Sequence, residues 1–481
     1  MKILSRNKSK FSKVSCAVLF CFQIFTGNAV AQERPIYERE DIFHSVIGEQ
    51  GMVATQEELA TKAGLEVLKE GGNAVDAAVT IGFTLAVTLP RAGNLGGGGF
   101  MLIHLAETKE TIAIDYREKA PLAATQDMFL AENGEVDPEK SRFSHLAVGV
   151  PGTVAGLAMV LEKYGTISLE RALQPAIELA ENGIIVTDDL RESLIFAQKI
   201  MAASPASMEI FYKEGGVPYE VGERLVQKDL AKSLRLIAKK GAAGFYEGEI
   251  GEAIASEMAA NGGLITEKDL AKYEPVIREP IEGNYRGDQI SSMPPPSSGG
   301  VHLIQMLNIL EEFPINELGH NTAQTIHLMA ETMKLAYADR SQYLGDPDFV
   351  DVPIDQLISE TYADILRPKI NTFVATPSSE IAPGNPYQVP ESNETTHYSV
   401  IDKDGNAVAN TYTLNFSYGT GITVPGTGIL LNNEMDDFSA KPGVPNAFGL
   451  IGDSYNAIEP EKRMLSSRNV ESCNKTLHFS L

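Results

Sequence analysis

The segment Glu394-Thr395-Thr396-His397-Tyr398-Ser399-Val400 places a threonine where a polar, proline-containing stretch meets a strand. Residues 377–394 carry four prolines and no periodicity, which is typical of an exposed linker. From Thr395 onward the period changes to two, as in a strand. Cleavage before Thr395 would leave an α-amine, with a pKa of about 8, beside the hydroxyl of the same residue. One residue would then supply both nucleophile and base, although on spacing alone β-propensity is the commoner reason for this Thr-Thr pair.

Two strands are predicted after this junction, over residues 395–402 and 407–415. Asp404-Gly405 between them is a strong hairpin turn signal. If these two residues form the turn, paired positions sum to 809 (404 plus 405), which places Thr413 opposite Thr396 and beside Thr395. A bulge would shift this register by one residue.

Upstream, two consecutive helices are predicted. The pattern Thr55-Gln56-Glu57-Glu58 indicates a capping box for the first helix, and Gly71-Gly72 ends it. Asn73 caps the second helix, whose apolar run from Ala77 to Leu89 predicts complete burial. The glycine-rich loop at 94–99 then indicates a close approach of backbone to another group.

The rest of the chain alternates between strand and helix patterns. Residues 100–104 and 111–116 are predicted as a strand pair, and 154–259 as mainly helical. SSMPPPSSGG at 291–300 indicates a stiff proline run that ends in a flexible elbow, and 322–343 a long helix.

The N-terminus has the three parts of a secretory signal. Its basic start contains no acid, residues 14–25 form a mostly apolar run, and Ala29-Val30-Ala31 is an A-x-A cleavage site. The run is too short to span a bilayer, which takes about 20 residues. We therefore predict a signal peptide at 1–31 and export, to the periplasm in a Gram-negative host. Only Cys473 would remain, so no internal disulfide is expected.

Composition excludes some function classes. The 481 residues include 40 Lys plus Arg against 64 Asp plus Glu, a formal charge of -24, which argues against a protein that coats nucleic acid. The chain contains no HExxH, no Cys–His metal spacing and no G-x-S-x-G. The glycine run lacks the Lys-Ser/Thr of a P-loop, so a close-packed turn is its simpler interpretation.

Eight sequence blocks together resemble the γ-glutamyltransferases, a family of N-terminal-nucleophile hydrolases. In order, they are GGNAVDAAV from Gly71, AGNLGGGGFM from Ala92, DYREKAP from Asp115, VPGTVAG from Val150, MPPPSSGG from Met293, AYADRSQYLGDPDF from Ala336, ETTHYSV from Glu394 and NNEMDDFSAKPGVPN from Asn432. The resemblance implies an α+β fold, a four-layer αββα sandwich. It also implies self-cleavage between Glu394 and Thr395. The cleavage gives a large-subunit region, 32–394, and a small-subunit region, of which 395–467 is the start.

The resemblance also assigns a substrate and a site. Thr395 would attack the γ-carbonyl of glutathione or another γ-glutamyl amide, and water, an amino acid or a peptide would accept the γ-glutamyl group. No cofactor, metal, nucleic acid or membrane anchor is implied. Thr413 would support the nucleophile; Arg117, Ser466 and Ser467 would hold the substrate α-carboxylate; and Asn415, Glu434 and Asp437 would accept from its α-ammonium. Phe448 falls where some relatives have a lid tyrosine.

Without the family, simpler interpretations exist for two of these residues. Arg117 would be a surface ion-pair partner of Glu118, and Asp437 would lie in a solvated acidic turn beside Asp436. A related secreted acylase or γ-polyglutamate-processing enzyme is an alternative within the same enzyme class.

The likeness ends after Ser467, and 468–481 forms a divergent tail without the glycine pair that supplies the family's oxyanion hole. This difference suggests a C-terminally truncated copy and predicts little or no transferase activity. A catalytically inactive remnant is therefore the alternative from another class.

Overall fold

The computed structural model describes residues 46–381, 395–467 and 470–474. The chain divides into two units, Met1–Gly48 and Glu49–Leu481, and the architecture below is that of the second. The predicted signal at 1–31 and the predicted cleavage residue Glu394 lie outside the described residues.

The centre of the unit is a six-stranded antiparallel sheet in the order β1-β11-β12-β2-β3-β8. Its strands are β1 (Gly51–Ala54), β2 (Gly98–Leu105), β3 (Glu110–Tyr116), β8 (Val276–Arg278), β11 (Thr396–Asp402) and β12 (Ala407–Thr413). The predicted strand pair and hairpin are thus both confirmed. Because β12 pairs with β2, the segment that follows Thr395 lies inside a sheet built largely from residues about 300 positions earlier.

A second sheet, of three strands, stacks on the first. It has the order β15 (Glu471–Asn474), β10 (Asp288–Ser292), β9 (Ile281–Tyr285). Phe100 and Leu102 from the large sheet form one buried cluster with Met293 and Val470 beside the small sheet. The predicted tail at 468–481 therefore contributes a strand within its described part.

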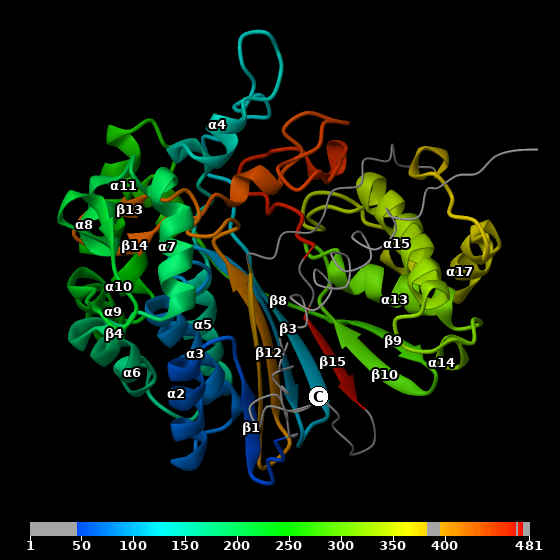
Figure 1. Ribbon diagram of the computed structural model, residues 1–481, viewed down its shortest axis with the longest axis horizontal. Coiled ribbons are helices and arrows are strands. Elements are labelled where there is room, and N and C mark those ends of the chain that lie inside the picture. Colours follow the sequence, from blue (N-terminus) through cyan, green and yellow to red (C-terminus); the bar gives the residue numbers. More distant parts are fainter. Residues whose placement is uncertain (1–45, 382–394, 468–469, 475–481) are drawn as a thin grey trace, which may run out of the picture. The chain divides into compact units, whose positions relative to one another are not determined.

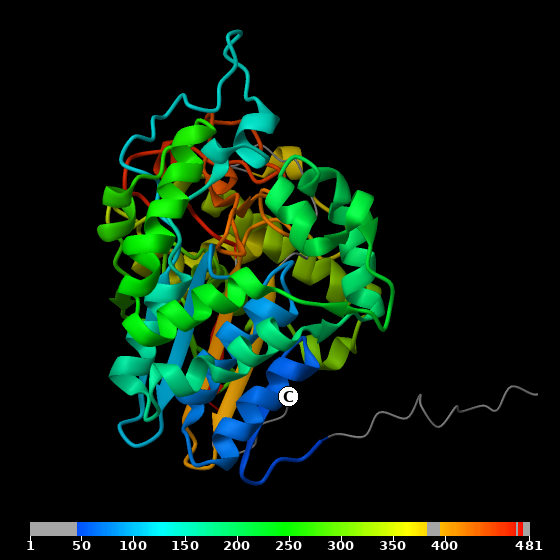
Figure 2. The same ribbon diagram turned by 90° about the vertical axis from the view of Figure 1, so that its left-hand side faces the viewer.

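Helices cover the outer face of each sheet (Figure 1). On the large sheet, α3 (Ala74–Thr88) contacts β11 and β12 and α5 (Thr153–Tyr164) contacts β3, while α2 (Glu58–Lys69) and α6 (Leu169–Asn182) pack on α3. Figure 2 shows this helix layer in front of the strands. On the small sheet, α13 (Gly299–Leu310) contacts β9 and β10, and α15 (Ala323–Tyr343) and α17 (Glu360–Leu366) pack on α13. The fold is α+β with the layers αββα, as predicted.

Further helices and three small ribbons complete the unit. The helices are α4 (Pro138–Arg142), α7 (Asp188–Met201), α8 (Pro205–Phe211), α9 (Lys228–Lys240), α10 (Ala243–Tyr246), α11 (Gly248–Ala260), α12 (Glu267–Ala271), α14 (Ile315–Leu318) and α16 (Ile354–Leu357). Three two-stranded ribbons pair β4 (Ile184–Ile185) with β7 (Arg224–Leu225), β5 (Tyr212–Lys213) with β6 (Val217–Pro218), and β13 (Thr423–Val424) with β14 (Ile429–Leu430). In the described part of the chain, no helix has both the length and the apolar character that a bilayer span requires.

The buried helix α3 fixes the position of the β11–β12 hairpin. Asn73 and Asp76 form its capping box, and all 15 of its residues are buried, as the apolar run predicts. Tyr398 and Tyr412 of the hairpin donate their hydroxyls to the carbonyls of Ala78 and Gly82, at 2.9 and 2.8 Å. These bonds attach β11 and β12 directly to the helix.

The predicted cap of α2 is wrong by two residues. The helix begins at Glu58, and Glu57 rather than Thr55 caps it. The Glu57 carboxylate accepts from the amides of Leu59 and Ala60 at 3.0 and 2.9 Å, which satisfies two of the free N–H groups of the first turn.

The predicted hairpin register is wrong by one. Thr396 lies opposite Tyr412, so paired positions sum to 808. The Asp402 carboxylate accepts from the amides of Asp404 and Asn406, both at 3.0 Å, and its own amide donates to the Asn406 carbonyl. This side-chain cap enlarges the turn beyond Asp404-Gly405. In the observed register Thr413 is level with Thr395 rather than with Thr396.

The proline run does not end in a flexible elbow. β10 extends to Ser292 and α13 begins at Gly299, so both ends of the predicted run belong to regular elements. A Cβ at Gly300 would lie 2.3 Å from the Met293 carbonyl oxygen, so the glycines permit close packing here rather than motion.

Candidate functional site

One end of the large sheet gathers the residues singled out in the sequence. β12 ends at Thr413, which pairs with Gly98 at the start of β2, and β3 ends one residue before Arg117. Thr395 directly precedes β11 at the same end and is partly buried. The antiparallel order therefore brings Thr395, Thr413 and Arg117 to the same end of the sheet. Figure 1 shows the orange loops after β12 above this end.

The glycine-rich loop is a close-packed turn at this end of the sheet. A Cβ at Gly97 would lie 2.0 Å from the Thr413 carbonyl oxygen, and one at Gly96 would lie 2.1 Å from that of Leu430. The Asn94 side chain closes the loop by accepting from the amide of Gly97 at 2.9 Å and the hydroxyl of Thr153 at 2.7 Å. This geometry matches the simpler interpretation of the glycine run.

Asn432 ties this loop to the acidic segment that follows it. Its side-chain nitrogen donates to the carbonyls of Gly96 and Gly149, both at 2.8 Å. Its side-chain oxygen accepts from the amides of Gly149 and Glu434 at 2.9 and 3.0 Å. Glu434 is thereby fixed relative to the end of the sheet.

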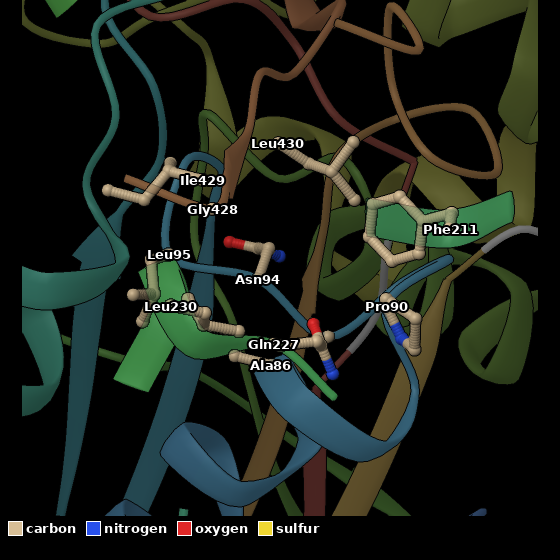
Figure 3. Close-up of a pocket in the computed structure, with 11 residues that line it drawn as sticks. Ala86, Pro90, Asn94, Leu95, Phe211, Gln227, Leu230, Gly428, Ile429 and Leu430 are labelled. Carbon is tan, nitrogen blue, oxygen red and sulfur yellow. The ribbon is translucent and has the colours of Figure 1, made fainter. Parts of the chain in front are cut away.

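A small pocket lies beside the glycine-rich loop, at the C-terminal end of α3 (Figure 3). Most of its lining is apolar, for example Phe211 and Leu230, and its polar members are Asn94 and Gln227. Asn94 is engaged within the loop, and Gln227 donates to the Val87 carbonyl at 2.8 Å. The lining contains no ionisable side chain, so the pocket is not where a charged substrate group would bind.

Arg117 is the centre of a buried group of charges, which we call the Arg117 cluster. Its guanidinium is fully buried and donates to carboxylate oxygens of Glu434 and Asp437. Its Nε donates to the Met464 carbonyl at 3.2 Å. A third carboxylate, that of Glu118, lies 3.7 Å from Arg117 Nη1 and is also fully buried. The simpler interpretation of Arg117 as a surface partner of Glu118 is therefore wrong.

The cluster holds three carboxylates around one guanidinium. Burial alone would lower the pKa of Arg117, but the charges of Glu434, Asp437 and Glu118 raise it above its ordinary value, so Arg117 stays charged. Asp437 is 9% exposed and its neighbour Asp436 is 5% exposed, so the predicted solvated acidic turn is a buried one. Burial raises the pKa of Asp436.

Asn415 lies between the cluster and Thr413. Its backbone has a positive φ of 78°, a conformation that asparagine tolerates better than most residues. Its amide N–H donates to Thr413 Oγ1 at 3.1 Å, and its side-chain nitrogen donates to the Asn433 carbonyl at 3.0 Å. The strand end and the acidic segment are thus joined through one residue.

Ser466 and Ser467 follow the segment that accepts from Arg117 Nε. Ser466 is fully buried, and its backbone pairs with residues 296–298. Ser467 is partly exposed, and its hydroxyl has no hydrogen-bond partner among the described residues. Both lie within three residues of the Met464 carbonyl that Arg117 contacts.

Phe448 belongs to a small aromatic group above Asn415. Its ring lies 5.3 Å from that of Phe416, edge to face, and Phe416 is also 6.1 Å from Phe143. Asp436 holds the same loop because it accepts from the amide of Ala447 at 3.1 Å and from the hydroxyl of Ser141 at 2.7 Å. Phe448, which the resemblance places at the position of a lid tyrosine, thus contacts the ring of Phe416, the residue after Asn415.

A second buried charge group was missed in the sequence, and we call it the Asp115 cluster. Arg278 and Arg463 lie 2.8 and 3.4 Å from the two oxygens of Asp115. Asp346 accepts from the Arg463 amide at 2.7 Å, and Asp348 accepts from both terminal nitrogens of Arg278 at 3.1 and 2.8 Å. Asp115 also accepts from the Arg117 amide at 3.0 Å, so the two clusters share a strand end.

The structure therefore gathers Arg117, Glu434, Asp437 and Asn415, with Thr413 joined to Asn415. A family model described as Gamma-glutamyltranspeptidase matches residues 60–469, most of the chain. The chain belongs to this family.

Individual relatives agree with the family match. A Glutathione hydrolase proenzyme of Escherichia coli K12 is 54% identical over 460 residues, which cover 95% of this chain and 78% of the relative. The crystal structure of Helicobacter pylori gamma-glutamyltranspeptidase matches with a TM-score of 0.68 at 48% identity, covering 73% of this chain and all of that one. A cephalosporin acylase from Bacillus halodurans matches with a TM-score of 0.77 at 29% identity, covering 92% and 78%.

Some contributing residues in this gamma-glutamyltranspeptidase chain were not singled out from the sequence as site or framework residues. Asn432, Asp115 and Asn94 lie inside the quoted blocks, but nothing local marks them as polar hubs, because their partners are remote in sequence. Buried polar groups that must each find a partner are the physical signal, and that signal needs the fold to be read.

Proposed function

We propose that this chain is the precursor of an exported γ-glutamyltransferase, which cuts itself between Glu394 and Thr395 and then transfers or hydrolyses γ-glutamyl groups. Glutathione and other γ-glutamyl amides would be the donors, and water, amino acids or peptides the acceptors. The observation that carries this proposal is the buried Arg117 cluster beside Thr413 and Asn415. Thr395 precedes the neighbouring strand at the same end of the sheet.

The processing step uses Thr395 alone as nucleophile. Its hydroxyl oxygen attacks the carbonyl carbon of Glu394, and the C–N bond breaks as the amine takes up the hydroxyl proton. Water then hydrolyses the resulting ester, which leaves a carboxylate at Glu394 and an amine at Thr395. The products are a large subunit, 32–394 after export, and a small subunit that begins at Thr395.

The catalytic step repeats this chemistry on the substrate. The Thr395 amine accepts the proton of its own hydroxyl, and the hydroxyl oxygen attacks the γ-carbonyl carbon. The amide C–N bond breaks, the leaving amine takes the proton, and a γ-glutamyl ester of Thr395 forms. Attack by water or an acceptor amine releases glutamate or a new γ-glutamyl amide and restores the threonine. Thr413 supports Thr395, since the observed register sets the two residues level.

The Arg117 cluster selects the substrate by both charges of its amino-acid head group. The guanidinium, with Ser466 and Ser467, holds the α-carboxylate, because planar donor pairs match a carboxylate. Asn415, Glu434 and Asp437 accept from the α-ammonium. In the structure, Arg117 binds Glu434 and Asp437 directly. When a substrate with both charges binds, its α-carboxylate takes the place of the acids at Arg117. Its α-ammonium takes the place of the guanidinium at Glu434 and Asp437. This exchange needs both charges, which favours γ-linked glutamate over α-linked peptides.

The first test is cleavage of the chain. Thr395→Ala should remain one polypeptide on a denaturing gel, because the hydroxyl needed for the acyl shift is gone. Thr395→Ser should process slowly, since it lacks the methyl group that restricts the rotamer. Thr396→Val is the matched control, because the Thr396 hydroxyl has no hydrogen-bond partner among the described residues, and it should process normally. Cleavage of the alanine variant at the same bond would assign the cut to another protease.

An acylase is the second candidate, supported by the structural likeness to a cephalosporin acylase. A γ-glutamyl anilide and a glutaryl anilide differ only in the α-ammonium group. Asp437 and Glu434 predict a strong preference for the γ-glutamyl compound, whereas an acylase would accept the glutaryl compound equally well. Failure to turn over either anilide would favour the inactive remnant.

Export is proposed from the sequence pattern at 1–31. N-terminal sequencing of the exported protein should begin at Gln32. A protein that keeps Met1 and stays in the cytoplasm would contradict this.

A further inference from the structure

A chain of hydrogen bonds reaches the Ser466–Ser467 pair from the helix layer on the small sheet. Ser298 is the N-cap of α13 and is fully buried. Its amide and its hydroxyl both donate to the Ser466 carbonyl, at 2.8 and 2.9 Å. The Ser466 amide in turn donates to the Pro296 carbonyl at 2.8 Å. Both backbone groups of Ser466 are therefore held by the loop that precedes α13.

Arg340 holds Ser298 from behind. It lies in the last turn of α15, is 4% exposed, and its Nε donates to Ser298 Oγ at 3.2 Å. A guanidinium has donors only, so the Ser298 hydroxyl must accept from Arg340 and can direct its own proton only outward. The acceptor it finds is the Ser466 carbonyl. The charge on Arg340 polarises the hydroxyl and strengthens this second bond.

The surroundings of Arg340 show that this charge is kept in a buried setting. His302, one turn after Ser298 on α13, packs against Tyr337 with the two rings tilted and their centres 4.8 Å apart. Burial and the charge of Arg340 lower the pKa of His302 to about 3, so its imidazole is neutral. Burying a guanidinium costs free energy of desolvation. A buried arginine that binds the Ser298 hydroxyl therefore indicates that the position of this loop matters.

We propose that Arg340 and Ser298 are positioning residues that set the Ser466–Ser467 pair for the substrate α-carboxylate. Neither touches the substrate; they act through the Ser466 backbone. This inference rests on the proposed function, because it deepens the role given there to Ser466 and Ser467. It assigns the outer helices α13 and α15 a part in substrate specificity (Figure 1).

Two ligands separate positioning from general stability. L-glutamate carries the whole head group, and 4-aminobutanoate is the same molecule without the α-carboxylate. Calorimetric titration of the purified protein with each ligand gives two dissociation constants. Ser298→Ala should weaken L-glutamate binding about tenfold, the loss expected for a well-placed hydrogen bond, and leave 4-aminobutanoate unchanged. Arg340→Met should do the same.

Two further variants serve as controls. Ser298→Thr keeps the hydroxyl and should restore L-glutamate binding. Ser341→Ala, next to Arg340, removes a hydroxyl whose partner among the described residues is the Ala338 carbonyl of its own helix, and it should change neither constant. If Ser298→Ala misfolds, as a shifted thermal transition would show, Arg340→Met carries the test.

The possible outcomes are distinct. An equal loss for both ligands, or no loss for L-glutamate, in Ser298→Ala and Arg340→Met would overturn the positioning role. A wild-type protein that fails to distinguish L-glutamate from 4-aminobutanoate would instead overturn the head-group site of the proposed function.

Discussion

Two buried groups of charges meet at the end of β3, and they differ in the ratio of acids to arginines. In the Asp115 cluster, the buried acids Asp115 and Asp346 face two arginines, Arg278 and Arg463. The third acid of this cluster, Asp348, lies at its rim and is 46% exposed. In the Arg117 cluster, Glu118, Glu434 and Asp437 face one arginine. The clusters are two residues apart on one segment, so local sequence does not explain the difference.

The difference separates holding a fold from holding a ligand. A balanced buried group satisfies itself, and its members fix neighbouring backbone, as Asp346 does for the Arg463 amide. Where carboxylates outnumber arginines, ion pairing with arginine offsets a smaller share of the cost of burying the acids. A cationic ligand group would relieve that cost, and so the Arg117 cluster is suited to bind an ammonium while the Asp115 cluster is not.

The largest effect should follow from breaking the balanced cluster. Asp115→Asn leaves Arg278 and Arg463 buried without their central carboxylate, and it should lower the free energy of unfolding by about 3–5 kcal/mol. Urea denaturation measures this. Asp364→Asn, which removes only an exposed pair with Arg367, should cost less than about 1 kcal/mol. A mild loss for Asp115→Asn would mean that this cluster does not hold the fold.

The unbalanced cluster should respond in the opposite way. Glu434→Gln removes one of the three carboxylates, so the ligand-free protein should be no less stable than the wild type. L-glutamate binding should weaken about 10- to 100-fold, because a charge-assisted bond contributes about 1.5–3 kcal/mol. Glu461→Gln, at an exposed pair with Lys272, is the control and should change neither property. A stability loss like that of Asp115→Asn would erase the distinction between the clusters.

Patterns with short range could be predicted from the sequence. The capped, apolar stretch after Asn73 became α3, and the alternation after Thr395 became β11. Which side chain would bond the backbone at a turn or a helix end could not be predicted. The Asp402 carboxylate enlarges the hairpin turn and shifts the register by one, and Glu57 replaces Thr55 as a cap because its longer side chain reaches two amides.

The candidate site, too, was predictable only in part. The blocks that resemble the γ-glutamyltransferases contain Arg117, Asn415, Glu434 and Asp437, and the fold brings these together. That Arg117 would already be bound to Glu434 and Asp437 was not predictable, since each was assigned to a different charge of the substrate. Ser298 and Arg340 also lie in quoted blocks, but their link to Ser466 exists only once the two sheets are stacked.

The smallest effect concerns the exposed rim of the balanced cluster and its dependence on pH. The Asp348 side chain is 46% exposed. The hydrogen bond from Arg278 lowers the pKa of Asp348 below its ordinary value of 3.8, against the opposing effect of burial. A lowered folded-state pKa means that the folded protein favours the ionised form, so the stabilisation is present above 3.8 and is lost as pH falls through the folded pKa.

Asp348→Asn should therefore cost at most about 1 kcal/mol at pH 7, because solvent screens a half-exposed pair. The difference in unfolding free energy between wild type and variant should shrink towards zero as the pH drops below 3.8. Urea denaturation at a series of pH values measures it, and 1 M salt at pH 7 should reduce it as well. A difference that is constant with pH would show that Asp348 acts by packing rather than by charge, and the rim would then contribute nothing to the electrostatic balance that distinguishes the two clusters.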